Sequence, residues 1–193
     1  MFALVQSNQI KKYFLGNKGV TIGDTQYPKT IFTLWNEEER NAIGIYTVVF
    51  DNSSKKDDEW YINTDISYSF SNNTVVGSYG AAVGKNLDDQ YDDDNKIVSY
   101  GLKSKKKNII KQQAKDLLTK TDWYVIKATE VESYSVPENI TQYRTDIRTK
   151  SNEMEQMIDD ANSVKSLKEL FDYTEQEDGS VTRPLGEFPI LEQ

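Results

Sequence analysis

The chain has 193 residues, which fits one large domain or two small ones, and 37% of them are hydrophobic. Its formal net charge of −8 disfavours nucleic acids and anionic membranes as partners, because both repel an acidic protein. The absence of cysteine and histidine excludes disulfides, thiolate nucleophiles, cysteine-ligated metals and histidine-based catalytic triads. We therefore expect no enzyme and no cofactor. No run approaches the length of a membrane span, and the first residues do not resemble a signal peptide.

Residues 1–85 favour β-strands. Runs of β-prone side chains occupy residues 2–6 and 10–15, and the polar residues between them suit a hairpin turn. Residues 27–35 are interpreted as a third extended run, because Pro28 disfavours a helical conformation of the residue before it.

A short helix is predicted next. Asn36 followed three residues later by Glu39 is typical of a capping box, and this helix would end near Gly44. Residues 45–50 then form a strong strand. In the segment "ISYSFSNNTVVGSYG", residues 66–80, aromatic side chains alternate with serines as in a half-buried strand, and "SNNT" supplies a turn. These patterns predict a mostly antiparallel β domain.

Two loops carry weak functional signals. Residues 86–99 include an acidic run and are interpreted as a linker or an exposed loop. Its aspartates could bind calcium, but they lack the alternating ligands and final glutamate of a calcium loop, so a solvated loop is preferred. The glycines between residues 76 and 84 depart from the spacing of a nucleotide-binding loop, which favours a hairpin end.

From residue 100 the hydrophobic period becomes helical. One face of the first helix is apolar and the other carries lysines between residues 103 and 115. Lysines 103–107 could bind phosphate or an acidic partner, but a solvated helix face is preferred, with the preceding aspartates offsetting their charge at the helix start.

The rest of the helical region is less regular. Residues 121–131 are interpreted as a break followed by a short extended piece. Apolar residues at helical spacing up to Ile158 predict a second long helix, with Asn139 and Gln142 capping each other, and a short third helix follows. The predicted fold class is α+β: an N-terminal, mostly antiparallel β domain over residues 1–85, a linker over 86–99, a C-terminal α-helical hairpin over 100–173 and an extended tail over 174–193.

The C-terminal half carries a spaced motif. Leu-Leu, two residues and Thr-Asp-Trp are followed by Pro and an acid, by Tyr-Arg, two residues and Ile-Arg, and by Leu, two residues and Leu-Phe. The positions are Leu117, Leu118, Thr121, Asp122, Trp123, Pro137, Glu138, Tyr143, Arg144, Ile147, Arg148, Leu167, Leu170 and Phe171. This pattern resembles the C-terminal region of tailed-bacteriophage tail proteins, including tail-fibre assembly and tail-assembly-chaperone-like proteins. The segments "MFALVQSNQIKKY" and "YPKTIFTLWNEEERNAIGIYTVVF" are similar to the opening of small phage proteins.

The resemblance implies a non-enzymatic structural protein of a phage virion: a tail, baseplate or tail-fibre component, assembled in the host cytoplasm. Its implied partners are other tail or fibre proteins and symmetric or homo-oligomeric copies of itself, with no nucleic acid and no membrane. Candidate interaction residues from the motif are Trp123, Tyr143, Arg144 and Arg148. From the residues alone, the preferred interpretation of Trp123 is a core anchor wedged between helices rather than a binding residue. The resemblance carries over no catalytic, cofactor-binding or metal-binding residue.

Other functions stay open. The chain would be an assembly chaperone if it holds a tail or fibre protein and is absent from the mature particle. It would be a host-glycan (receptor) binding protein if aromatic residues such as Trp60 and Tyr61 line an open groove, and full burial of Trp60 would exclude that site. A glycosidase would need two carboxyl groups facing each other across a cleft.

Overall fold

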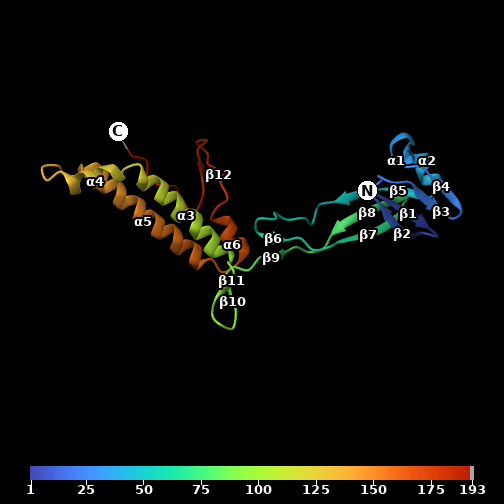
Figure 1. Ribbon diagram of the computed structural model, residues 1–193, viewed down its shortest axis with the longest axis horizontal. Coiled ribbons are helices and arrows are strands. Elements are labelled where there is room, and N and C mark those ends of the chain that lie inside the picture. Colours follow the sequence, from blue (N-terminus) through green and yellow to red (C-terminus); the bar gives the residue numbers. More distant parts are fainter. Residues whose placement is uncertain (192–193) are drawn as a thin grey trace. The chain divides into compact units, whose positions relative to one another are not determined.

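The computed structural model describes residues 1–191 and divides the chain into two compact units, Met1–Val83 and Gly84–Gln193 (Figure 1). The first unit is built on a mostly antiparallel sheet and the second on packed helices, which confirms the predicted α+β fold class. The boundary after Val83 lies close to the predicted end of the β domain at residue 85.

A five-stranded sheet organises the first unit (Figure 1). The strands lie in the order β2 (Gln9–Phe14), β1 (Phe2–Gln6), β5 (Ile45–Asp51), β8 (Thr74–Tyr79) and β7 (Ile66–Ser71). Neighbouring strands are antiparallel except for β5 and β8, which are parallel. Two short strands, β6 (Tyr61–Ile62) and β9 (Val83–Gly84), pair with each other.

The two outer hairpins of the sheet have left-handed turns. Ser7 and Asn8 join β1 to β2, Asn72 and Asn73 join β7 to β8, and their φ angles lie between 48° and 62°. Positive φ at both central residues is the geometry of a type I′ turn, whose twist matches that of the strands, and asparagine tolerates it well. Both hairpins were predicted from the sequence and are confirmed.

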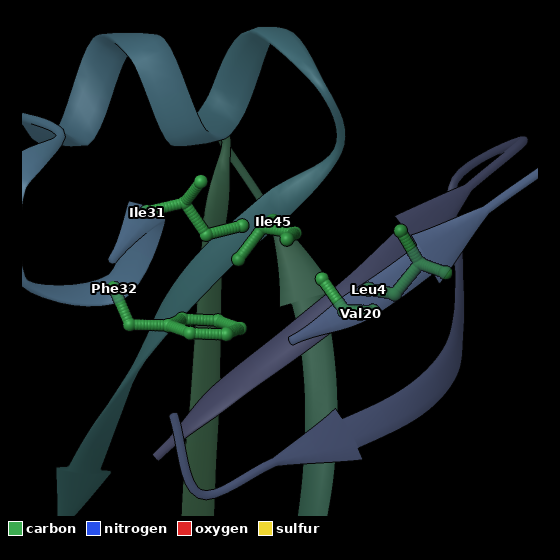
Figure 2. Packing of buried hydrophobic residues seen from close by; sticks show 5 residues of the cluster. All are labelled: Leu4, Val20, Ile31, Phe32 and Ile45. Atoms are coloured by element: carbon green, nitrogen blue, oxygen red, sulfur yellow. The ribbon is translucent and has the colours of Figure 1, made fainter. Parts of the chain in front are cut away.

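One face of the sheet is covered by the chain between β2 and β5. This segment contains the hairpin β3 (Val20–Ile22) and β4 (Thr25–Tyr27), and the helices α1 (Ile31–Leu34) and α2 (Glu37–Ala42). Figure 2 shows the cluster in which they meet the sheet, formed by Leu4, Val20, Ile31, Phe32 and Ile45. Burial of these side chains holds the first unit's helices on its sheet.

Residues 27–35 do not form the single extended run that was predicted. Strand β4 ends at Tyr27 and α1 begins at Ile31. The helical turn lets Ile31 and Phe32 both enter the core, whereas a strand would point consecutive side chains to opposite faces. The next helix, α2, is confirmed with its capping box between Asn36 and Glu39.

The side chains on the opposite face of the sheet form a second core, and the sheet curls around them. Its buried side chains include Ala3, Val48 and Val75, and the outer strands β2 and β7 contact each other. Tyr13 of β2 packs against Tyr68 of β7 with 4.7 Å between ring centroids. The sheet therefore curls until its edges meet, and this protects strand edges that would otherwise be open to pairing with another chain.

Gly77 makes room for this closure. It lies opposite Tyr68 in the β7–β8 ladder, and a Cβ at Gly77 would lie 2.8 Å from Cε1 of Tyr68. A glycine in a strand commonly marks such a close approach of another group. The ring of Tyr68 thus covers Gly77 and reaches Tyr13.

Substitution of this glycine tests the closure. We expect Gly77→Val to lower the free energy of unfolding of the first unit by about 1–3 kcal/mol, because the new side chain pushes Tyr68 away from Tyr13. Urea denaturation followed by near-ultraviolet circular dichroism of the tyrosines measures the change. Ser78→Val, on the same strand but the other face, is the matched control; equal losses in both variants would contradict the role given to Gly77.

The second unit is a helical hairpin. Helices α3 (Leu102–Thr119) and α5 (Glu138–Asp160) lie side by side, with α4 (Asp122–Glu130) between them in sequence and α6 (Val164–Glu169) after them (Figure 1). Buried residues recur every three or four positions, as expected for two amphipathic helices. They are Leu102, Lys106, Ile110 and Ala114 on α3, and Ile140, Tyr143, Ile147, Ser151, Met154 and Ile158 on α5.

Two details of the helical prediction are wrong. Residues 122–130 form α4 instead of an extended piece, because the break is confined to the junction after α3, and Asp122 in the first turn and Lys127 in the last turn suit the helix dipole. Helix α5 begins at Glu138 with Pro137 as its N-cap, so Asn139 and Gln142 do not cap each other. Gln142 instead donates a hydrogen bond to Asp146, one turn further along α5.

Residues 86–99, predicted as a linker or an exposed loop, lie within the second unit and form a mostly exposed hairpin. Strands β10 (Gln90–Tyr91) and β11 (Ile97–Ser99) pair within this segment. Asp89 accepts hydrogen bonds from the Gly101 N–H and the Ser104 hydroxyl, 2.7 and 2.8 Å long, and so caps the start of α3. An acidic group is favourable there because it faces the positive end of the helix dipole.

The tail also packs on the second unit. After a hairpin of β12 (Thr174–Glu175) and β13 (Val181–Thr182), Leu185 is fully buried and its N–H donates to the Leu170 carbonyl. Phe188 packs against the cluster that joins α3 to α5. The predicted extended tail therefore contributes Leu185 and Phe188 to the packing of the second unit, while its β12–β13 hairpin is exposed.

Candidate interaction surface

Arg144 joins the start of the spaced motif to its centre. From α5, its Nη1 donates to the Leu118 carbonyl at 2.8 Å and to the Thr121 hydroxyl at 2.6 Å, while Nη2 pairs with Asp122 at 2.9 Å. The Arg144 side chain is only 11% exposed. Hydrogen bonds from a charged donor are stronger than neutral ones, so Arg144 fixes the junction of α3 and α4 against α5.

The other motif residues divide between the core and the surface. Tyr143 is buried with Ala114 and Ile147 between the long helices. Arg148 is exposed and donates a hydrogen bond to the Arg144 carbonyl. Tyr143 and Arg144 thus hold the hairpin together, and of this pair of arginines Arg148 is the accessible one.

Trp123 lies on the surface. Its side chain is 52% exposed, so its interpretation as a core anchor is wrong. Its ring contacts Tyr124, and the Lys127 ammonium lies 5.2 Å from the ring centroid. Trp123 lies on α4, and its side chain points to solvent. The predicted extended piece did not indicate which side of the chain would be buried.

Trp123 belongs to a wider apolar area on and beside α4. We call this area the α4 surface and define it by its exposed apolar side chains, of which Ile126 is 54% exposed. They are Trp123, Val125, Ile126 and Val131. On a helix, Trp123 and Ile126 lie three positions apart on one face, whereas Val125 points to another. Neighbouring exposed apolar side chains such as Trp123 and Ile126 are typical of a protein contact, whereas isolated ones need no explanation.

The aromatic pair proposed for glycans is not on the surface. Trp60 is only 3% exposed, and Tyr61 is partly buried with the Lys56 ammonium 4.6 Å from its ring centroid. A sugar cannot stack on a buried ring. The condition set for this glycan site therefore fails at Trp60.

A groove with cationic walls runs between α3 and α5, and the sequence did not predict it. Its volume is about 490 Å³. Lys111, Lys115, Arg144 and Arg148 supply its positive charges. The lysines of α3 recur at helical spacing, but only the packing of α3 against α5 brings the two arginines beside them.

The acidic run that was weighed as a calcium site is occupied by local contacts. Asp88 forms an ion pair with Lys103, 3.5 Å away. This agrees with the expectation that the aspartates compensate the charge of the lysines at the start of α3. Asp92 accepts a hydrogen bond from the Lys96 N–H. Within residues 1–191 no three acidic side chains gather as a metal site, and no helix there is long and apolar enough to cross a membrane.

The groups whose pKa departs from its ordinary value lie in turns and in the tail. A hydrogen bond to Glu187 raises the pKa of Tyr173, and hydrogen bonds from Ser53 lower the pKa of Asp51. Hydrogen bonds from Ser180 lower the pKa of Asp178 in the turn between β12 and β13. These groups stabilise local turns, and none lines the groove between α3 and α5.

No family model, curated protein or solved structure matches the chain.

The role of Arg144 can be tested by its removal. Arg144→Met should lower the free energy of unfolding of the second unit by about 2–3 kcal/mol, since it removes the charged donor that joins the Leu118 carbonyl to the Thr121 hydroxyl and leaves Asp122 without its ion-pair partner. Urea denaturation followed by far-ultraviolet circular dichroism reports the loss of helix. Arg148→Met, one turn away and exposed, should change stability by less than about 0.5 kcal/mol. If both variants behave alike, Arg144 does not hold the helix junction.

Proposed function

We propose that the chain is a non-enzymatic structural component of a bacteriophage tail, baseplate or tail fibre. It acts by contacting other tail or fibre proteins and works in the virion after assembly in the host cytoplasm. The observation that carries this proposal is the α4 surface, where Trp123 and Ile126 are each more than half exposed. Tryptophan is enriched among the residues that dominate binding energy at protein interfaces.

The geometry around the α4 surface supports a preformed contact. Arg144 and Thr121 fix the start of α4 against the long helices, so Trp123 is presented from a rigid base. A rigid surface loses little conformational entropy on binding, which favours affinity. The assignment to a phage tail comes from the resemblance of the spaced motif, of which Thr121, Asp122 and Arg144 meet at this base.

An assembly chaperone is the second candidate. An exposed apolar surface such as that of Trp123 and Ile126 would equally hold a client protein before its assembly. The two functions differ in where the chain ends up. A chaperone leaves its client, whereas a structural component stays in the particle.

Particle composition separates the two functions. We expect mass spectrometry of purified particles of the phage that encodes the chain to find it in a fixed ratio to the major tail protein. Absence from particles, together with abundance in infected-cell lysate bound to a tail or fibre protein, would overturn the structural function and establish the chaperone.

Substitution of the α4 surface tests the contact itself. Trp123→Ala combined with Ile126→Ala should reduce incorporation into particles at least about tenfold, because a buried aromatic anchor contributes 2 kcal/mol or more to an interface. Both side chains are exposed, so helix content and unfolding should stay close to wild type. Leu34→Ala combined with Val181→Ala removes exposed apolar groups elsewhere and is the matched control. Normal incorporation of the α4 variant would exclude this surface as the contact.

A further inference from the structure

The groove between α3 and α5 carries more positive charge than its own surroundings neutralise. Lys111 pairs with Glu155 at 3.2 Å, and Arg144 pairs with Asp122 at 2.9 Å. Lys115 and Arg148 also line the groove, and neither forms an ion pair with any of residues 1–191. We call this surface the basic groove; two positive charges remain uncompensated in a chain whose net charge is −8.

The hairpin of β10 and β11 carries the opposite charge at its tip. Asp92, Asp93 and Asp94 follow one another in the turn and are all exposed. Lys96 of the same turn pairs with Asp94 at 3.6 Å and donates its N–H to Asp92. Three aspartates against one lysine leave two negative charges at what we call the acidic tip.

The strands that carry the acidic tip are themselves uncovered. Every residue from Tyr91 to Tyr100 is exposed, including Ile97 and Val98. A two-stranded hairpin is only marginally stable in water without packing on another element. The acidic tip therefore stands on a support with apolar side chains available to a partner.

The residues that line the basic groove are complementary to the charge and the apolar side chains of such a hairpin. Between its cationic side chains, Ala114 and Leu118 contribute apolar lining. Its volume of about 490 Å³ is open to solvent, so it can receive side chains from the surface of a partner. Apolar lining with cationic walls matches a partner that brings carboxylates together with aliphatic and aromatic groups.

We propose that the basic groove binds the acidic tip of a second copy of this chain. In the contact, Lys115 and Arg148 of one copy face Asp93 and Asp94 of the next. Because the two surfaces differ, the contact is head-to-tail, and repeated copies form either a closed ring or an open chain. This contact is independent of the proposed function and uses a surface other than α4, so either proposal can fail without the other.

Other acidic segments fit the groove less well. At the start of α2, Glu39 is engaged in the capping box with Asn36, and Glu37 and Glu38 beside it lie in the first turn, where the helix dipole stabilises them. Around residue 58, Asp57 accepts a hydrogen bond from the Glu59 N–H, and Asn63 donates to Asp58. Asp93, by contrast, has no hydrogen bond or ion pair with any residue of the described chain.

Charge swaps test the contact directly. Analytical ultracentrifugation of the full chain should show concentration-dependent association whose dissociation constant rises at least about tenfold between low salt and roughly 0.5 M NaCl. Lys115→Glu combined with Arg148→Glu should abolish association, and so should Asp93→Lys combined with Asp94→Lys. An equimolar mixture of these two variants should associate again, because each then meets the opposite charge.

Matched controls separate the contact from net-charge effects. Lys18→Glu combined with Lys165→Glu changes the net charge as the groove variant does, and Glu175→Lys combined with Glu177→Lys changes it as the tip variant does. Both controls should associate like wild type. A chain that stays monomeric at low salt, a mixture that fails to associate, or a monomer whose groove binds a fluorescent hexaglutamate peptide instead would each overturn the proposal.

Discussion

The geometry of the second unit depends on one guanidinium. Arg144 reaches from the second turn of α5 to the end of α3 and the start of α4, where it meets a carbonyl, a hydroxyl and a carboxylate. Thr121, which accepts one of these bonds, is almost fully buried and donates its own hydroxyl proton to Leu118. Without this network the unpaired carbonyls at the end of α3 would face the start of a new helix. The direction of α4, and with it the exposure of Trp123, follows from this network.

The sequence predicted those features that local chemistry controls. The two hairpin turns, the capping box of Asn36 and the apolar stripe of α5 all depend on residues within a few positions of each other, and all are present. The failures lie where distant residues decide. Phe32 is helical because the core needs two neighbouring side chains on one side, and Trp123 is exposed because Arg144, 21 positions later in the sequence (144 − 123), orients the helix that carries it.

The fold, more than the amino-acid composition, determines where unpaired charges remain on the surface of this protein. A net charge of −8 suggests a uniformly acidic surface, yet the aspartates before α3 are used locally, with Asp89 as a helix cap and Asp88 as the partner of Lys103. Across the hairpin, Lys107 pairs with Asp159 at 2.7 Å, so part of the lysine face holds α3 to α5. The sequence could not divide these lysines, because it does not specify which of them face a carboxylate of α5.

Burial also separates two tryptophans that look alike in sequence. Trp60 and Trp123 both follow an acidic residue and precede a tyrosine, and both were candidates for an interaction. Trp60 is enclosed in its unit, where its large apolar area contributes to folding, whereas Trp123 leaves more than half of its side chain in water. A folded chain gains little from an exposed indole. The stabilisation that such a residue can provide is realised only when a partner covers it, whereas Trp60 already stabilises its own unit.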